Sequence, residues 1–341
     1  MMKELLDLQK IIVPEMLQLM EKRYHILRNV LVWQPIGRRL LAGKLLIGER
    51  IVRKEITFLQ EQGLLEVNAG GMSVTPEGKE VIHQLKESIY QLRGIRHLQE
   101  SLQKKLGLKQ VIVVSGNLEE EEYVLNDLGK VAAALLQQNL KPGMVLGVTG
   151  GSTMAAVADN LNTVKKWEDV TVVPARGGFG REVEKQANTV VSQIARKLGA
   201  KYQLLHASDN LSQEAIKSVL NDPAIKKVID TIKTTQCIVF GIGRADEMAL
   251  RREFSQEQID YLIKHRAVAE SFGFYFTRDG TIVHEIETLG INFGDFLTIK
   301  HAIGVAGGAK KAEAIYTISK LKPQMMLVTD EAAAMEIMQH Y

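Results

Sequence analysis

The stretch VLGVTGGSTMAAVADNL, residues 145–161, is the strongest indication of the fold and the first indication of function. It predicts a buried strand, a tight turn at Gly150 and Gly151, and an apolar helix that opens with the hydroxyls of Ser152 and Thr153. The free N–H groups and the positive dipole end of such a helix face the turn, where glycines let a ligand approach the backbone closely. The turn is therefore a candidate phosphate site, although ordinary strand-to-helix connections carry the same residue types. It matches neither of the glycine fingerprints of nucleotide-binding proteins.

From residue 109 onward, apolar strands alternate with helical stretches. This alternation predicts a doubly wound, Rossmann-like α/β domain with a parallel sheet covered on both faces. The expected strands are 111–114, 145–148, 170–173, 202–205, 237–240, 272–276, 303–305 and 326–328. The expected helices are about 120–140, 152–161, 183–199, 213–220, 223–232, 256–264, 309–319 and 330–339. In such sheets, ligands bind at the carboxyl ends of the strands, near a switch point in strand order.

Four of these strands end in glycine-rich turns, and three of the turns carry Arg or Lys. The turns read TGGST (149–153), PARGG (174–178), GIGR (241–244) and AGGAKK (306–311). If they meet at one edge of the sheet, they form a cradle for a small ligand with more than one phosphate. Arg251, Arg252 and Glu270 lie in segments that could close over such a ligand, and a carboxylate among cations could accept sugar hydroxyls. Each basic residue taken alone is more often solvated surface than a ligand contact.

Positive charge is concentrated near the N-terminus. Residues 1–110 hold 18 Lys and Arg against 12 Asp and Glu, whereas the rest of the chain holds 25 against 28. Within 22–54 there are nine basic residues and one acid, Glu49. A basic head on a mildly acidic body favours a head that binds a polyanion.

The same region predicts a winged helix-turn-helix. We expect a leader helix before Pro14, a helix over about 14–32, a short helix with Ile36, Leu40 and Leu41, a turn at Leu46–Gly48, and a second helix over about 49–62 that buries Ile51, Val52, Ile56 and Leu59. Residues 64–78, LLEVNAGGMSVTPEG, predict a β-hairpin that forms the wing. A plain pair of packed amphipathic helices is the alternative.

In a helix-turn-helix the second helix enters the DNA major groove with its N-terminal end. The outward basic residues predicted to contact DNA are Arg38, Arg39, Arg50, Arg53 and Lys54. Arginine can pair with guanine edges, and lysine neutralises phosphate.

Residues 79–106 predict one connecting helix with a single internal glycine, Gly94. Its first apolar residues alternate by three and four, a coiled-coil spacing, at Ile82, Leu85, Ile89 and Leu92. This favours pairing between subunits, as a homodimer or a tetramer, although the helix could also pack against its own chain. The predicted domains are 1–88 (DNA binding), 89–108 (linker helix) and 109–341 (effector binding).

Several classes of protein are disfavoured. A single cysteine, Cys237, excludes an internal disulfide framework, and the eight His fall in no ligand spacing, so we expect no metal and no cofactor. The first residues lack a secretory apolar core, and no apolar stretch approaches the roughly 20 residues of a membrane span. We therefore expect a cytoplasmic protein without membrane contact.

The combined motifs resemble the SorC/DeoR-type bacterial sugar-responsive regulators over essentially the whole chain. The motifs that carry the resemblance are RRLLAGKLLIGERIVRKEITFLQEQGLL in the head and VTGGST, PARGG, KQANT, VFGIG and VAGGAKKAEAI in the body. The resemblance implies a repressor of glycolytic genes that binds operator DNA and is relieved by fructose 1,6-bisphosphate. It also implies an effector domain similar in fold to sugar-phosphate isomerases and glucosamine-6-phosphate deaminase.

The effector contacts implied by the resemblance are Gly150, Gly151, Ser152, Thr153, Arg176, Gly177, Gln186, Arg251, Glu270 and Lys311. Whether Arg251 or Arg252 contacts the effector stays open. Arg244 departs from the family pattern, which has an acid there. If Arg244 points inward, the extra positive charge puts the identity of the effector in doubt.

Two other functions remain open from the sequence. A sugar-phosphate isomerase or deaminase would need a positioned acid–base group, and Glu270 is the one candidate. A DNA-binding protein with a vestigial pocket would show no response to any sugar phosphate.

Overall fold

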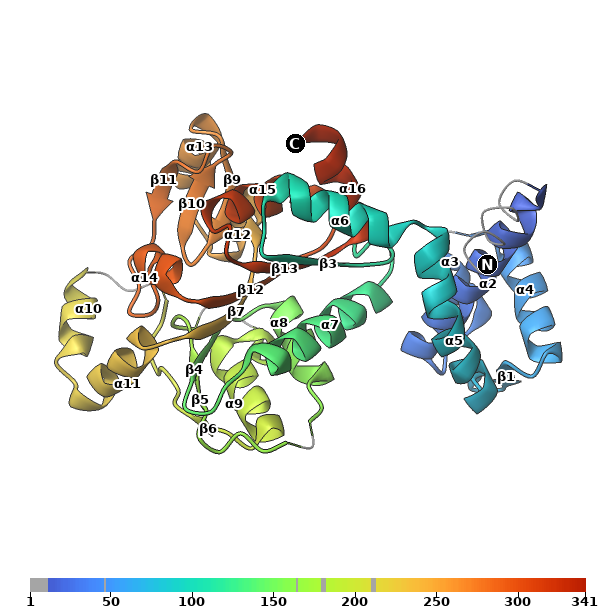
Figure 1. Ribbon diagram of the computed structural model, residues 1–341, viewed down its shortest axis with the longest axis horizontal. Helices are drawn as coiled ribbons and strands as arrows, with labels where there is room; N and C mark the ends of the chain where they lie inside the picture. Colours follow the sequence, from blue (N-terminus) through green and yellow to red (C-terminus); the bar gives the residue numbers. More distant parts are fainter. Residues whose placement is uncertain (1–11, 46, 164, 179–181, 210–212) are drawn as a thin grey trace. The chain divides into compact units, whose positions relative to one another are not determined.

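The structure is a computed structural model that describes residues 12–45, 47–163, 165–178, 182–209 and 213–341. The chain forms two compact units (Figure 1), a head of Met1–His97 with Leu118–Val124, and a body of Leu98–Asn117 with Leu125–Tyr341. The predicted leader helix lies almost wholly outside the described residues, as does Leu46 in the predicted turn.

The head has the predicted order of helices and a hairpin. Its elements are α2 (Pro14–Trp33), α3 (Arg38–Leu45), α4 (Glu49–Glu61), β1 (Leu65–Asn68), β2 (Gly71–Val74) and α5 (Pro76–Leu92). The two strands pair in antiparallel register, Leu65 opposite Val74. Ile36 extends this hairpin, because its N–H donates to Met72 O at 3.2 Å and its carbonyl accepts from Met72 N at 2.8 Å. The winged helix-turn-helix prediction is confirmed.

Two expectations about the head are wrong. Ile36 precedes α3 instead of lying in it, and Ile51, which was expected to be buried, is 46% exposed, whereas Val52 is fully buried. The buried stripe of α4 consists of Val52, Glu55, Ile56 and Leu59, and Ile51 lies beside that stripe. The sequence prediction missed a charged residue, Glu55, among the buried positions.

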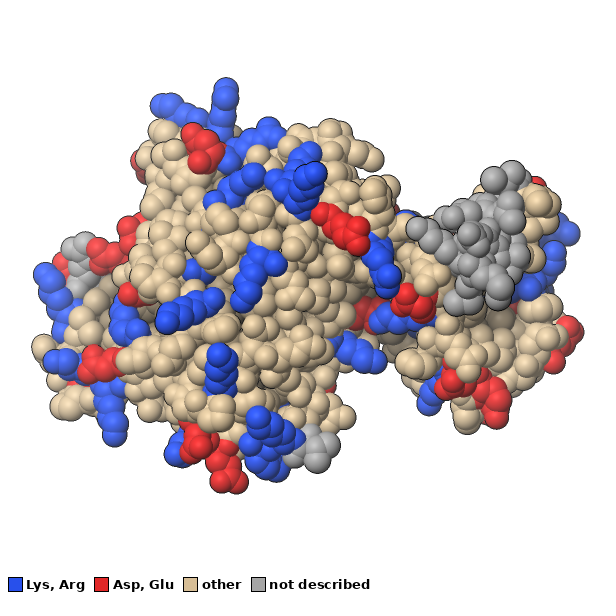
Figure 2. All heavy atoms as spheres, in the orientation of Figure 1, with Lys and Arg blue, Asp and Glu red and all other residues tan. Residues whose placement is uncertain are grey.

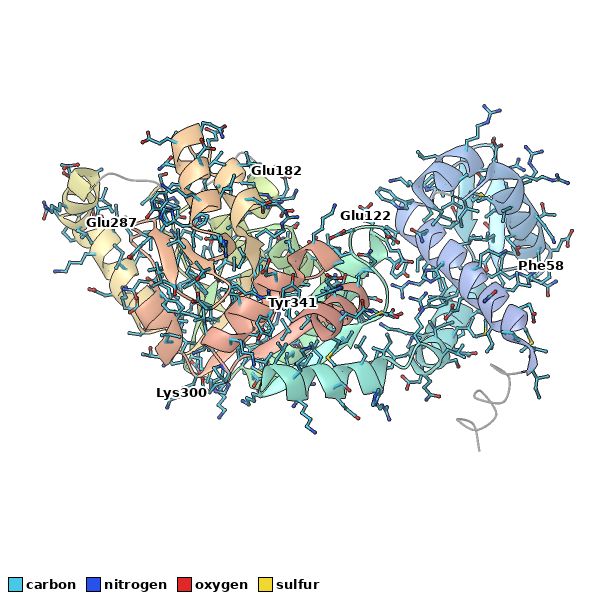
Figure 3. The ribbon with its side chains drawn as sticks, turned by 90° about the horizontal axis from the view of Figure 1, so that it is seen from above. Phe58, Glu122, Glu182, Glu287, Lys300 and Tyr341 are labelled. Carbon is cyan, nitrogen blue, oxygen red and sulfur yellow. The ribbon has the colours of Figure 1, made fainter. Side chains whose placement is uncertain are left out.

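Glu55 holds α4 against α2. Its carboxylate accepts from Arg23 Nε at 2.8 Å and lies 3.3 Å from Lys22 Nζ. The Arg23 guanidinium also lies 3.5 Å from the ring centroid of Phe58, which Figure 3 labels in the head. Burial would raise the pKa of the Glu55 carboxyl, but the hydrogen bonds from Arg23 and Lys22 outweigh it, so the pKa is lowered.

The connecting helix is not continuous. Helix α5 ends at Leu92, Gly94 adopts a left-handed φ of +65°, and α6 begins anew (Ile95–Leu106). The residues with coiled-coil spacing pack into the core of their own head, where Ile82, Ile89 and Leu92 are buried and Leu85 is partly buried. The interpretation of this stretch as a seam between subunits is therefore wrong.

The body is built on seven parallel strands in the order β3-β13-β12-β7-β4-β5-β6 (Figure 1). All five residues of β13 are buried, as expected when helices cover both faces of a sheet. The strands are β3 (Gln110–Val114), β4 (Val145–Val148), β5 (Thr171–Pro174), β6 (Lys201–Tyr202), β7 (Cys237–Gly241), β12 (His301–Val305) and β13 (Met326–Asp330). The predicted parallel α/β class is confirmed, but β6 is shorter than the expected strand 202–205.

Most predicted helices of this part are present. They are α7 (Tyr123–Asn139), α8 (Ser152–Asn160), α9 (Ala187–Leu198), α10 (Gln213–Leu220), α11 (Pro223–Lys233), α13 (Gln256–Lys264), α15 (Ala312–Leu321) and α16 (Glu331–His340), with short 3-10 turns η1 (Val183–Lys185) and η2 (Ala309–Lys311). The described residues include no helix that is long and apolar enough to cross a membrane.

A second sheet was not predicted. The expected strand 272–276 proves to be part of a four-stranded antiparallel sheet in the order β11-β10-β9-β8. Its strands are β8 (Gly243–Arg244), β9 (Ala267–Ser271), β10 (Phe274–Thr277) and β11 (Ile282–Glu285). Two short helices were also missed, α12 (Ala245–Arg251) and α14 (Phe293–Thr298). The runs are too short for periodicity to separate strand from loop.

We expect Glu55→Gln to destabilise the head by roughly 1 to 3 kcal/mol, because charge-assisted hydrogen bonds are lost at a buried site. A carboxyl with a lowered pKa stabilises the fold at higher pH, and this contribution is lost as the pH falls through the folded-state pKa. The variant should therefore show a weaker loss of stability in acid. Urea unfolding in a Trp167→Phe background, where Trp33 fluorescence reports on the head, measures both effects. Glu61→Gln, exposed on the same helix, is the control; equal acid sensitivity in all three proteins would contradict the assignment.

Candidate effector pocket and DNA-binding surface

A pocket of about 270 Å³ lies at the carboxyl ends of the parallel strands. The chain runs from β4 to β5 and β6 on one side and returns to β7 on the other, so the gap between β4 and β7 is a switch point. Thr149 joins the two strand ends, since its N–H donates to Val239 O at 3.2 Å and its hydroxyl accepts from Gly241 N at 3.2 Å. The pocket lies where doubly wound sheets bind their ligands.

The turn after β4 favours glycine at both positions 150 and 151. Gly151 has a φ of +114°, which favours glycine, and its N–H donates to Lys185 O at 2.7 Å. A Cβ on Gly150 would lie 2.6 Å from the same carbonyl oxygen. The turn is thus pressed against the segment before α9, and the N-terminus of α8, with Ser152 and Thr153, lines the pocket.

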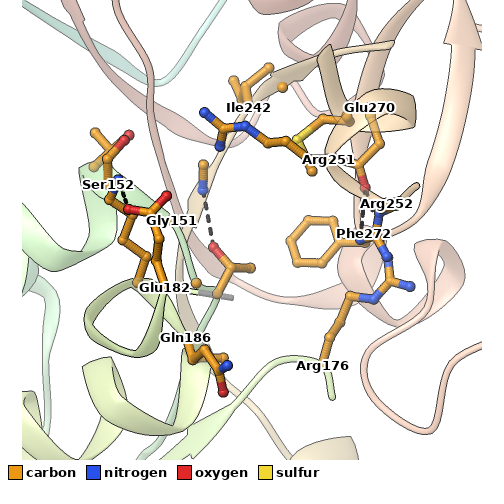
Figure 4. A pocket seen from close by; sticks show the side chains of 18 of the residues that line it. Gly151, Ser152, Arg176, Glu182, Gln186, Ile242, Arg251, Arg252, Glu270 and Phe272 are labelled. Carbon is orange, nitrogen blue, oxygen red and sulfur yellow. Dashed lines mark hydrogen bonds and ion pairs between the residues drawn. The ribbon is translucent and has the colours of Figure 1, made fainter. Parts of the chain in front are cut away.

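Two arginines and two carboxylates, Arg176, Arg252, Asp209 and Glu270, form a buried cluster. Of these, Arg176, Arg252 and Glu270 line the other side of the pocket (Figure 4). Asp209 accepts from Arg176 Nε at 3.0 Å, from Arg252 Nη1 at 2.8 Å and from the Thr288 hydroxyl at 3.0 Å. Glu270 Oε1 lies 3.9 Å from Arg176 Nη1 and 3.6 Å from Arg252 Nη2. The opposite charges balance within the cluster, as a buried site requires.

Arg176 retains donors for a ligand. Its Nη1 and Nη2 are buried and make no hydrogen bond within the part of the chain that the structure describes. Burial lowers the pKa of its guanidinium, while the carboxylates of Asp209 and Glu270 act to raise it. Gly273 leaves it room, because a Cβ there would lie 2.0 Å from Arg176 Nη1. Leaving such donors unsatisfied costs about 1 to 3 kcal/mol, which an anionic ligand could recover.

Lys311 adds positive charge from the end of β12. Burial lowers the pKa of its ammonium group, and the cations Arg251 and Arg244 lower it further, although Glu247 and Asp330 oppose them. An anion in the pocket would relieve the repulsion between Lys311 and Arg251 and raise the pKa of Lys311 again. This part of the pocket therefore favours a negatively charged group.

All ten residues predicted as effector contacts line this one pocket. Their role in binding an effector stays a prediction. Arg251 and Arg252 both line it, but only Arg252 is buried in the ionic cluster. Arg244 is not a lining residue and pairs with Asp246 at 3.1 Å and with Glu247 at 3.7 Å, but its charge still acts on Lys311.

Sequence reasoning missed Asp209, which orients both arginines of the cluster. It follows β6 in HASDN, a stretch with no glycine turn to draw attention to it. In the structure, the segment with Asp209 packs tightly against the turn after β5, because a Cβ on Gly177 would lie 2.8 Å from Asp209 N. Phe272, Ile242 and Met248 also line the pocket and give it an apolar part.

Glu270, the acid–base candidate of the enzyme alternative, is already paired in the structure. Glu270 Oε1 accepts from Gly273 N at 2.7 Å and faces both arginines, so this oxygen is engaged. The described residues include no group of three or more His, Cys, Asp or Glu that could hold a metal ion.

The five basic residues predicted to contact DNA are all exposed, two on α3 and three on α4. Figure 2 shows Lys and Arg atoms along the edge of the head where Figure 1 draws α4. Arg50, Arg53 and Lys54 occupy the first two turns of α4, the part that enters the groove in helix-turn-helix proteins. The wing tip, Asn68–Gly71, carries no basic residue.

The chain matches two protein families. Residues 19–89 match the "CggR N-terminal DNA binding domain" and residues 90–339 the "Putative sugar-binding domain". The "Central glycolytic genes regulator" of Priestia megaterium is 40% identical over 342 residues and covers 100% of both chains. The protein of that name from Bacillus subtilis is 38% identical over 337 residues and covers 99% of both.

Two solved structures are also similar. A "putative SorC family transcriptional regulator" from Enterococcus faecalis is 37% identical, covers 71% of this chain and 100% of its own, and has a TM-score of 0.67. The full-length sorbitol operon regulator SorC from Klebsiella pneumoniae is 21% identical, covers 90% of this chain and 95% of its own, and has a TM-score of 0.67, so it supports the fold alone.

We expect Asp209→Asn to destabilise the body by roughly 3 to 5 kcal/mol, because it leaves two buried arginines short of one charge. Asp246→Asn, which removes a carboxylate from an exposed arginine pair, should cost about 1 kcal/mol or less. Urea unfolding of the full chain, followed by Trp167 fluorescence in a Trp33→Phe background, measures both variants. Equal losses for the two variants would contradict the assigned role of Asp209.

Proposed function

The chain belongs to the family of the central glycolytic genes regulators, and from this premise we propose that it represses glycolytic genes and that fructose 1,6-bisphosphate in the body relieves the repression. As a family member it is a transcriptional regulator with a DNA-binding domain and a sugar-binding domain, and it is not an enzyme. We expect it to act in the cytoplasm, where its DNA lies.

One observation carries the choice of effector, namely that the pocket offers anion donors on two opposing sides. Figure 4 places Gly151 and Ser152, at the N-terminus of α8, across the pocket from Arg176 and Arg252. A helix N-terminus and an arginine with spare donors are both good phosphate sites. A sugar with a phosphate at each end matches both sides at once, and Glu270 can accept from a hydroxyl between them.

Relief of repression requires that the effector bind one state of the protein more tightly than another. We propose that the active repressor is a homodimer or a tetramer whose paired heads contact two half-sites. Effector in the body then changes how the subunits pack, so that the heads no longer match the half-site spacing. By linkage, operator DNA must weaken effector binding by the same factor.

Fructose 1,6-bisphosphate should raise the melting temperature of the full-length protein much more than fructose 6-phosphate does. A ligand at 100 times its dissociation constant stabilises the folded state by about 2.7 kcal/mol. Lys311→Ala should shrink this rise, whereas Lys310→Ala, which removes the same charge from the exposed neighbouring position, should leave it intact. A rise with monophosphates alone would change the proposed effector. No rise with any sugar phosphate would support a vestigial pocket.

Arg50→Ala should weaken binding to double-stranded DNA and make the salt dependence of affinity shallower by about one unit of log–log slope if the lost contact is to phosphate. Fluorescence anisotropy with a duplex enriched from a random library measures both quantities. Lys79→Ala is the control, since it removes one exposed charge from the head outside α3 and α4. If Lys79→Ala weakened binding as much as Arg50→Ala, α4 would not be the DNA-contacting helix.

A further inference from the structure

A single acid lies among the cations of the DNA-binding surface. Glu49 is the first residue of α4, and residues 22–54 contain nine Lys and Arg but no other Asp or Glu. It precedes Arg50 and lies one turn before Arg53, in the part of the helix that meets base edges in helix-turn-helix proteins. A carboxylate at that place repels the DNA backbone, so its presence needs a reason.

Glu49 touches two arginines from different helices. Its Oε1 lies 3.4 Å from Arg53 Nη2 on α4, and its Oε2 lies 3.8 Å from Arg39 Nε on α3. The side chains are 41% exposed for Glu49, 64% for Arg53 and 90% for Arg39. Exposed pairs of this kind contribute little to stability. Folding therefore gives only a weak reason for an acid here, apart from its favourable place at a helix N-terminus.

The hydrogen-bond chemistry of a carboxylate gives a stronger reason. A carboxylate only accepts hydrogen bonds, and in the major groove only cytosine and adenine present an amino donor. Guanine presents two acceptors and thymine presents an acceptor and a methyl group, so both are rejected. In adenine the amino group stands beside the N7 acceptor, which repels a carboxylate, whereas cytosine offers its amino group without that neighbour. A glutamate therefore selects cytosine.

The contact between Glu49 and Arg53 couples the choice of cytosine to the binding of a neighbouring base by Arg53. Arg53 lies four residues after Glu49 on the same face of α4, and a guanidinium pairs with the two acceptors of guanine. While the head is free of DNA, Glu49 lies beside Arg53 and neutralises part of its charge. DNA phosphates then attract the head less. Glu49 and Arg53 separate at no cost only where a cytosine amino group binds Glu49 and a guanine binds Arg53.

We propose that Glu49 is a specificity-determining residue of the DNA-binding head, which reads the amino group of one cytosine in each half-site and weakens binding to DNA that lacks it. The inference rests on the proposed function only in that α4 enters the major groove with its N-terminal end. It assigns to Glu49 a role distinct from that of the five basic residues, which supply affinity.

The test is selection of double-stranded DNA from a random library by the full-length protein, followed by sequencing. In Glu49→Gln, whose amide can also donate, we expect the preference for cytosine at one position of each half-site to fall about tenfold. The preferences at the other positions should remain, and affinity for unselected DNA should rise. Glu49→Ala should show the same losses. Glu61→Gln, which removes one exposed charge from the far end of α4, should behave as wild type.

Unchanged base preferences in both Glu49 variants would overturn the inference. Arg50→Ala, measured in parallel, separates this failure from failure of the premise. If Arg50→Ala loses DNA affinity while the Glu49 variants keep every preference, only the role of Glu49 is wrong. If Arg50→Ala also selects the same DNA with the same affinity, α4 does not enter the groove and both the premise and the inference are overturned. Wild-type melting temperatures establish that each variant is folded.

Discussion

The ion pairs of the buried Asp209 carboxylate hold together the arginine side of the candidate effector pocket. The carboxylate accepts from Arg176 at the end of β5 and from Arg252 just after α12, so one acid joins the parallel sheet to the antiparallel part of the body. Two guanidinium groups packed this closely would repel each other in a medium of low dielectric constant unless an acid were shared between them. Because Asp209 and Glu270 balance their charge, the arginines can stay buried and oriented while Arg176 keeps donors for a ligand.

The two sides of the pocket therefore differ in electrostatic character. The side with Arg176 and Arg252 is close to neutral, because Asp209 and Glu270 lie against the two arginines. The other side gathers Lys311, Arg251 and the N-terminus of α8, and the acids Glu247 and Asp330 act against the positive charge there. A phosphate should be attracted first to the positive side and then be positioned by contacts with the neutral one. Helices α7 and α8 pack closely, since a Cβ on Gly129 would lie 2.4 Å from Ala156 O.

Much of this arrangement could be predicted from the sequence, and the rest failed for physical reasons. Apolar runs followed by glycine turns are strong signals, so most of the parallel strands were expected near their observed positions, and the ten predicted contact residues line one pocket. Periodicity could not say which partner an apolar stripe meets, and Ile82 and Leu92 pack into their own head rather than against a second subunit. Buried charges such as Glu55 and Asp209 have no sequence signal, because their partners, Arg23 and Arg252, are far away in the chain.

If the protein works as proposed, a ligand in the body changes the affinity of the head for DNA. The most direct measurement is the dissociation constant of the full-length protein for its selected DNA duplex, at fixed salt, with no effector and with saturating fructose 1,6-bisphosphate. A typical coupling of about 1 to 3 kcal/mol predicts a 5- to 150-fold weaker affinity with the effector. The same dissociation constant in both conditions, at an effector concentration that raises the melting temperature, would contradict the account.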